Sequence, residues 1–282
     1  MNYEIKNSFI KAKIKSFGAE LNSLQKIEND FEYIWQADSQ YWARHSPVLF
    51  PIVGRLKNDS YFYKDKKYSL SQHGFARDKE FELIKKEDDF IEFSLKNDEE
   101  TLKNYPFSFE LNISYKLEKT KLIISYKVKN RSEDRLYFSI GAHPAFNISS
   151  GDFLDFEDVR TSKRYFLDNK GLIYKNQEVS FTKNSLILDE EIFKNDALVF
   201  NDKNIKSIIL RDKNSNKILK VEFKDFPYLG VWSKPNLAPF VCIEPWFGVS
   251  DEENSNQNIE NKRGVQVLLK DELFSCFYSI EI

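Results

Sequence analysis

Alternation of apolar and polar residues runs through this 282-residue chain from end to end. It is clearest in residues 107–118 (FSFELNISYKLE), 121–130 (KLIISYKVKN), 207–212 (SIILRD), 218–223 (ILKVEF) and 264–269 (GVQVLL). A period of two places successive side chains on opposite faces of a β-strand, so each segment predicts a strand with one buried face. Roughly twenty such segments are present, and the chain is therefore predicted to be all-β with mainly antiparallel strands.

Stretches rich in Asn, Asp and Lys separate the predicted strands. Residues 117–122 (LEKTKL) and 211–217 (RDKNSNK) have the composition of hairpin turns. Helical signal is scarce and is limited to residues 39–45 (SQYWARH) and 97–105 (NDEETLKNY). The second predicted helix must end before Pro106, because proline cannot continue a helix.

The chain shows no sign of a division into parts. No linker rich in Pro, Gly or Ser and no fixed-period repeat interrupts the strand pattern. We therefore expect one domain over residues 1–282, a large antiparallel sandwich rather than a propeller. Residues 250–264 (SDEENSNQNIENKRG) are the most loop-like stretch and are expected to form a solvated surface loop.

Composition and charge exclude several classes of partner. The 42 basic and 44 acidic residues give a net charge of −2, so the extended basic field that nucleic-acid binding requires is missing. The N-terminal residues alternate in polarity, unlike a signal peptide, and the apolar runs are too short to cross a membrane. Cys242 and Cys276 belong to no CxxC pair, which favours a reducing cytoplasm over a disulfide-rich secreted fold.

Only three histidines are present, so each can be weighed as a catalytic candidate. His45 lies before an apolar run with two prolines (YWARHSPVLFP), and we assign it a structural role. His73 precedes Gly74, which lets the backbone adopt a positive φ or approach another group closely, and Arg77 and Asp78 follow. For His73, catalysis and packing are both open on these residues alone.

His143 and Glu244 each lie at the end of an apolar strand and directly before a proline. In SIGAHPAFNI, the proline favours an extended backbone at His143 and so fixes the direction of its ring. In FVCIEPWFG, Glu244 is a carboxylate in apolar surroundings, which is costly unless it has a partner or a task. A stacked core histidine and an ion pair with an arginine are the structural alternatives.

Arg55 completes the set of polar candidates. It follows a glycine after an apolar strand (PIVGRLKND) and would present a rigid set of donors to substrate oxygens. Asp196, in NDALVF, is a further candidate of this kind. The sequence has no Ser-His-Asp order, phosphate-binding glycine loop or clustered metal-ligand spacing. Proton transfer between imidazole and carboxylate is the chemistry that remains.

Four motifs in this order, FPIVGRLKND, QHGFARD, GAHPAFN and IEPWFG, resemble the aldose 1-epimerase (mutarotase) family, and most of all its LacX-like bacterial branch. The similarity extends over nearly the whole chain, including IKSFGAELNSL near the N-terminus. It implies a β-supersandwich of the galactose mutarotase type, in agreement with the strand pattern. We expect an isomerase without metal or organic cofactor that acts on a small-molecule sugar, as a monomer or homodimer in the cytoplasm.

The resemblance also implies roles for individual residues. His143 would be the general acid at the ring oxygen of the sugar, and Glu244 the general base at the anomeric hydroxyl. His73 and Arg55 would orient the sugar and stabilise charge, with His73 counted among the catalytic residues. Asp196 is matched only loosely by the family pattern.

Two features bear on the substrate. Trp246 and Phe247 would offer the sugar ring an apolar face, although core packing explains both aromatics about as well. The HGFAR motif replaces the commoner HGG and resembles the hexose-6-phosphate 1-epimerases, in which the arginine is associated with phosphate. Arg77 therefore either binds phosphate or pairs with an acid such as Asp78 and supports the loop. The alternatives are a free-aldose 1-epimerase, a hexose-6-phosphate 1-epimerase and a non-catalytic carbohydrate-binding protein.

Overall fold

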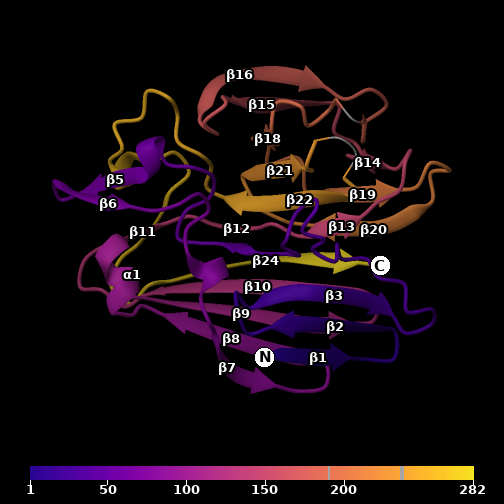
Figure 1. Ribbon diagram of the computed structural model, residues 1–282, viewed down its shortest axis with the longest axis horizontal. Coiled ribbons are helices and arrows are strands. Elements are labelled where there is room, and N and C mark those ends of the chain that lie inside the picture. Colours follow the sequence, from indigo (N-terminus) through magenta and orange to yellow (C-terminus); the bar gives the residue numbers. More distant parts are fainter. Residues whose placement is uncertain (190, 236–237) are drawn as a thin grey trace.

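The computed structural model describes residues 1–189, 191–235 and 238–282, and within them the chain is almost entirely β (Figure 1). The strands of these residues form five sheets, and every strand pair within a sheet is antiparallel. The predicted all-β, mainly antiparallel fold is confirmed. None of the helices in these ranges has the length and apolar character that crossing a bilayer demands.

Two large sheets carry most of the described strands. The first has the order β17 (Ser185–Ile187), β14 (Phe153–Asp155), β19 (Ser207–Arg211), β20 (Lys217–Glu222), β24 (Leu273–Glu281), β10 (Lys121–Asn130), β9 (Phe109–Glu118), β8 (Phe90–Lys96) and β7 (Glu82–Lys86). The second has the order β16 (Ile173–Ser180), β15 (Thr161–Leu167), β18 (Leu198–Phe200), β21 (Tyr228–Trp232), β22 (Phe240–Phe247), β12 (Ile140–Ala142) and β4 (Val48–Leu49), with β13 (Ala145–Asn147) also paired to β22.

Smaller elements complete the described fold. A three-stranded sheet contains β1 (Asn2–Lys6), β2 (Ile10–Lys15) and β3 (Glu20–Lys26). Two-stranded sheets pair β5 (Ser60–Tyr63) with β6 (Lys66–Ser69) and β11 (Leu136–Phe138) with β23 (Gln266–Leu268). The helices are α1 (Glu99–Asn104) and the 3₁₀ turns Lys57–Asp59, Ala76–Asp78 and Ile259–Asn261.

The sequence pattern explains the strands directly. In β10, Leu122, Ile124 and Val128 are buried, while lysines at the alternate positions are more exposed. The predicted turn at residues 117–122 joins β9 to β10, and the predicted turn at residues 211–217 joins β19 to β20. The five segments chosen from the sequence all contain a strand, although 264–269 contributes only the three residues of β23.

One of the two predicted helices forms. α1 begins after Asp98, whose carboxylate accepts a hydrogen bond from the Thr101 amide (2.6 Å), while Thr101 Oγ1 accepts one from the Asp98 amide (2.9 Å). The helix predicted at 39–45 was wrong, because the amides of Tyr41 and Trp42 both donate to Asp38 in a turn. The two aromatic side chains then pack against β22 and its neighbours instead of following a helical face.

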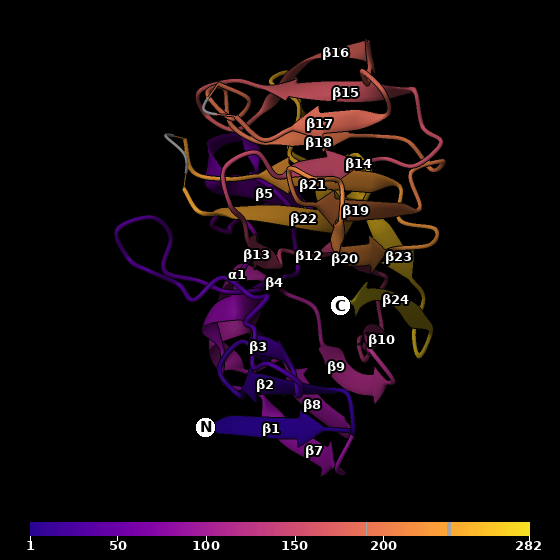
Figure 2. The ribbon, with the colours of Figure 1, turned by 90° about the vertical axis from the view of Figure 1, so that its right-hand side faces the viewer.

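The two large sheets face each other across one core. Ile124 of β10 and Val241 and Ile243 of β22 belong to the same cluster of buried side chains. β24 pairs with β10 on one side and with β20 on the other, so one sheet joins strands from both halves of the chain (Figure 2). This continuity supports the prediction of a single domain over 1–282, which stays a prediction.

β22 is packed on both faces, and this positions the site. Val241 and Ile243 point into the main core, whereas Cys242 and Trp246 belong to two separate clusters on the opposite face. Glu244 lies between these two residues on that second face, by the two-residue period of a strand. Phe247 points to the same side as Val241 and Ile243, and its ring centroid lies 4.6 Å from that of Phe226, which agrees with core packing, one of the two alternatives for this residue.

Candidate active site

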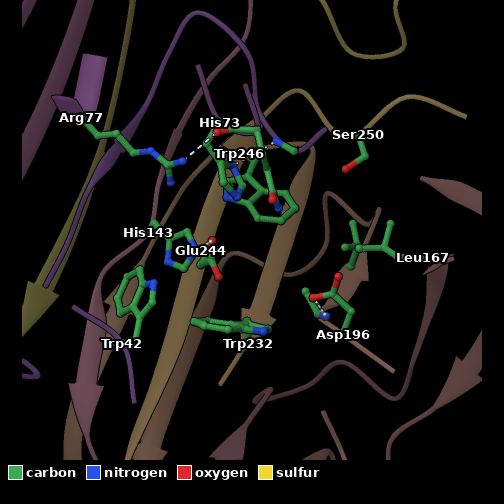
Figure 3. Close-up of a pocket in the computed structure, with 14 residues that line it drawn as sticks. Trp42, His73, Arg77, His143, Leu167, Asp196, Trp232, Glu244, Trp246 and Ser250 are labelled. Atoms are coloured by element: carbon green, nitrogen blue, oxygen red, sulfur yellow. Dashed lines mark hydrogen bonds and ion pairs between the residues drawn. The ribbon is translucent and has the colours of Figure 1, made fainter. Parts of the chain in front are cut away.

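A cavity of about 310 Å³ lies against the outer face of β22 (Figure 3). Six residues singled out in the sequence line it, namely His73, Arg77, His143, Asp196, Glu244 and Trp246. These residues are up to 173 positions apart in the sequence. Glu244 and Trp246 lie on β22, His143 follows the end of β12, and the other three lie outside the strands. The structure thus assembles these sequence candidates around one space.

Strand register places His143 beside Glu244. β12 pairs with one end of β22 through Gly141 and Trp246, and β13 pairs with the other end through Ala145 and Cys242. The residues between β12 and β13 therefore lie opposite the middle of β22, where the Ile243 amide donates to the Pro144 carbonyl (3.2 Å). As a result, His143 Nε2 is 3.2 Å from Glu244 Oε2.

This pair is buried and incompletely hydrogen-bonded. Glu244 is 1% exposed, and neither its Oε2 nor His143 Nδ1 has a hydrogen-bond partner among the described residues. Burial, with the nearby charge of Asp196, raises the pKa of Glu244 well above its ordinary value. Burial, with the charges of Arg77 and Arg44, lowers the pKa of His143 to about 3. These shifts favour the neutral pair, carboxylic acid and imidazole.

Aromatic rings enclose the pair. Trp42 stacks on the His143 ring, with 4.9 Å between centroids and 26° between planes, and Trp232 meets it edge-on at 5.8 Å. Both tryptophans line the cavity, and both were missed in the sequence. Trp232 is the last residue of β21 and the one residue of that strand that is partly exposed, and Trp42 lies in the segment mistaken for a helix.

Two glycines make room for Trp246. A Cβ atom added at Gly230 would lie 2.4 Å from the Trp246 ring, and one added at Gly141 would lie 2.5 Å from it. Both glycines are on strands that pair with β22. The indole Nε1 donates to the Ala142 carbonyl (3.2 Å), so the ring is held in one orientation against the cavity.

His73 has a left-handed backbone with φ of 68°, and Gly74 follows with φ of 71°. A Cβ atom at Gly74 would lie 2.3 Å from the Phe50 carbonyl oxygen, so glycine is required there. His73 Nδ1 accepts a hydrogen bond from the Gly54 amide (3.1 Å), which leaves Nε2 as the protonated ring nitrogen of a neutral imidazole. Burial and the nearby His143 and arginines lower the pKa of His73, which keeps this neutral form.

The sequence predicted a solvated surface loop at residues 250–264, but part of this segment is buried. Lys262 and Asp251 form a buried ion pair (2.9 Å), and Lys262 Nζ also donates to the Val249 carbonyl (2.6 Å). Asp251 Oδ2 accepts from the Lys57 amide (2.9 Å), and Ser250 Oγ accepts from the Arg55 amide (3.1 Å). This segment therefore fixes residues 54–57, which in turn hold His73 through Gly54.

Of the two candidate arginines, Arg77 lines the cavity and Arg55 does not. Arg55 is not among the described residues that line the cavity, because Asp59 binds its guanidinium at two points (2.8 and 2.9 Å). It lines a neighbouring pocket that also contains Gln72 and Arg77. Arg77 donates from Nη2 to the Gln72 carbonyl (2.8 Å), and its Nε lies 3.7 Å from Asp78. Burial lowers the pKa of Arg77 to about 10.

Asp196 and His45 are the remaining candidates, and of these Asp196 lines the cavity whereas His45 does not. Asp196 lines the cavity with a left-handed backbone, and its carboxylate accepts a hydrogen bond from the Ala197 amide (2.8 Å). His45 lies outside the cavity, where its ring is 3.5 Å from Glu20 and its amide donates to the same carboxylate (2.8 Å). The structural assignment of His45 agrees with these contacts.

Comparisons with known proteins agree with the resemblance to the aldose 1-epimerase family. The family model described as aldose 1-epimerase matches residues 1–270. The plasmid form of protein LacX from Lactococcus lactis is 34% identical over 300 residues, covering 100% of this chain and 99% of the relative.

Solved structures extend the comparison to the fold. The galactose mutarotase related enzyme of Lactobacillus acidophilus has 36% identity and a TM-score of 0.95, covering 100% of this chain and 97% of that one. A galactose mutarotase-like protein of Lactobacillus casei has 29% identity and a TM-score of 0.94, covering 100% and 99%. The predicted galactose mutarotase type of fold is confirmed.

Replacing Lys262 by methionine tests the buried ion pair. Lys262→Met leaves Asp251 as an unpaired buried charge, and we expect a loss of about 3–5 kcal/mol in the free energy of unfolding. Lys270→Met is the matched control, because its partner Glu133 is 86% exposed and such pairs contribute at most about 1 kcal/mol. Urea denaturation of both variants measures the difference, and equal losses would contradict a positioning role for residues 250–264.

Glu244→Gln tests the direction of the pKa shift. The folded state holds a proton that the unfolded chain releases above pH 4.5, so native stability decreases as pH rises until the folded pKa is passed. Glutamine does not titrate, and we expect the variant to gain stability relative to the native protein between pH 4 and pH 8. Urea denaturation at both pH values measures this gain. A stability difference that is the same at pH 4 and pH 8 would show that the Glu244 pKa is unshifted.

Proposed function

Because the chain belongs to the aldose 1-epimerase family, we propose that it is a mutarotase that interconverts the α and β anomers of a hexose. The observation that carries this proposal is the buried pair of His143 and Glu244, 3.2 Å apart in the wall of the cavity. The volume of about 310 Å³ is at the lower end of the roughly 300–1,000 Å³ typical of small-molecule sites, which suits a monosaccharide.

The chemistry requires two groups that exchange protons. Ring opening takes the proton from the anomeric hydroxyl and adds a proton to the ring oxygen, after which the C1–C2 bond rotates. Ring closure on the other face of the carbonyl reverses both transfers, so no proton, electron or atom is gained overall. One acid and one base suffice for this reaction, and both have to lie within hydrogen-bond reach of the sugar.

His143 and Glu244 share the single proton that this cycle needs. Burial favours that proton on the carboxyl group of Glu244. A sugar whose anomeric hydroxyl donates to Glu244 stabilises the carboxylate, because hydrogen bonding to a charged form favours that form. The proton then resides on His143, from where it is passed to the ring oxygen. Substrate binding thus converts the resting pair into the acid and base that the family resemblance implies.

The remaining lining residues orient the sugar. The neutral ring of His73 presents Nε2–H as a hydrogen-bond donor, because Nδ1 is occupied by the Gly54 amide. Arg77 presents a guanidinium whose Nε has no hydrogen-bond partner among the described residues. Trp42 and Trp232 provide aromatic faces, against which the C–H groups of a sugar ring pack. A hexose bound in this way meets donors on one side and aromatic rings on the other.

Polarimetry tests the function directly. Freshly dissolved α-glucose or α-galactose should reach its equilibrium rotation faster with the protein, at the same final value and with EDTA present. His143→Gln and Glu244→Gln should each lower the rate about 10²–10⁴-fold. Sugar-dependent quenching of tryptophan fluorescence without any acceleration would instead indicate a non-catalytic carbohydrate-binding protein.

Arg77 decides between free and phosphorylated sugars. If its guanidinium binds a 6-phosphate, Arg77→Ala should reduce turnover of glucose 6-phosphate about 10–100-fold more than turnover of glucose. Kinetics of both substrates are compared, with Arg131→Ala as the control because Arg131 pairs with Glu110 at the surface. Equal losses on the two substrates would eliminate the phosphate contact and favour a free-aldose mutarotase.

A further inference from the structure

We propose that His143, Cys242 and Glu244 form a binding site for a soft divalent cation such as Zn²⁺, and that this cation inhibits the reaction. One ligand atom of each residue, a ring nitrogen, Sγ and a carboxylate oxygen, lies within 4.8 Å of the other two. The three side chains are buried. The inhibitory part of the proposal rests on the proposed function, whereas the binding part does not.

The same strand register that builds the catalytic pair brings the thiol to it. Cys242 and Glu244 are two positions apart on β22 and therefore point to the same face. Cys242 pairs with Ala145, two residues after His143, so the histidine lies across the interstrand gap from both. The sequence gives no metal-ligand spacing, because the histidine is about a hundred positions from the other two residues.

The donor set fits zinc better than a hard cation. Imidazole nitrogen, thiolate sulfur and carboxylate oxygen are the ligands zinc takes, and a site of three protein ligands leaves a fourth position open. Tetrahedral zinc with these donors requires ligand atoms roughly 3.3–3.8 Å apart. His143 Nε2 and Glu244 Oε2 are already 3.2 Å apart, and the thiol has to close a gap of at most about 1.5 Å.

Electrostatics and hydrogen bonding leave the site available. Glu244 Oε2 has no hydrogen-bond partner among the described residues, and a cation bound between it and His143 Nε2 would replace the proton that the two residues share. Burial raises the pKa of Cys242, so the ion must displace the thiol proton, as zinc does on binding cysteine. Asp196 favours the added positive charge, and Arg77 opposes it.

A bound cation would stop the proposed reaction. It occupies the lone pairs of His143 and Glu244 that carry protons to and from the sugar. Cys242 takes no part in the proton transfers, so it separates cation binding from catalysis. A variant at this position should keep the mutarotation rate while it loses sensitivity to zinc.

Cobalt is the spectroscopic probe. Chelator-treated protein is titrated with Co²⁺, and a cysteine ligand is expected to produce a thiolate-to-cobalt absorption band in the near ultraviolet. Cys276→Ser, which removes the other thiol on β24, should keep the band, and Cys242→Ser should lose it. The Zn²⁺ concentration that halves the mutarotation rate should rise at least about 10-fold in Cys242→Ser and stay unchanged in Cys276→Ser.

Several outcomes would overturn the proposal. A band that persists in Cys242→Ser, the lack of any band in the native protein, or stimulation by Zn²⁺ would each do so. Circular dichroism checks that Cys242→Ser is folded, and Cys242→Ala replaces it if the buried hydroxyl prevents folding. The cobalt band is recorded without sugar, so failure of cation binding and failure of the mutarotase function give separate results.

Discussion

Burial of one carboxyl group, Glu244, is the constraint on which the rest of this site depends. It lies on the central strand β22, whose other face is fixed by Val241 and Ile243 in the main core. The strand cannot turn to expose Glu244 without withdrawing those side chains from the core, so the carboxyl remains out of water. Its proton affinity is therefore raised mainly by burial, with a further contribution from the charge of Asp196.

The surroundings of this carboxyl have the properties that proton exchange needs. Aromatic rings of Trp42 and Trp232 enclose His143, and two glycines allow the Trp246 ring to close on the neighbouring strands. The buried pair of Lys262 and Asp251 holds the loop that orients His73. Each contact stabilises the position of a ring without giving Glu244 Oε2 a hydrogen bond. The fold thus keeps the proposed acid and base, His143 and Glu244, 3.2 Å apart.

The strands and most of the site could be predicted from the sequence, because both leave local signals. Alternation marked β9 and β10, and an adjacent glycine or proline marked His73, His143 and Glu244 as residues with constrained backbones. Features that depend on tertiary contacts were not predictable. In the segment 39–45, Tyr41 and Trp42 pack against the aromatic cluster, and this tertiary contact outweighs the helical propensity of the segment. The 250–264 stretch is partly buried because Asp251 forms an ion pair with Lys262.

Cys242 illustrates how a binding site can be proposed from packing that no short motif records. A proton-transfer site must leave a nitrogen and an oxygen lone pair unpaired in a place where water does not satisfy them. Such lone pairs also attract cations, since a proton and a metal ion compete for the same electrons. A strand that carries a catalytic carboxylate presents its i−2 side chain on the same face, and here that side chain is a thiol. Substitution of Cys242 by a residue without a ligand atom would leave the proton chemistry intact and remove one of three donors. Under the two proposals, Cys242, which is not among the described residues that line the cavity, therefore adjusts the balance between protons and soft cations at this site.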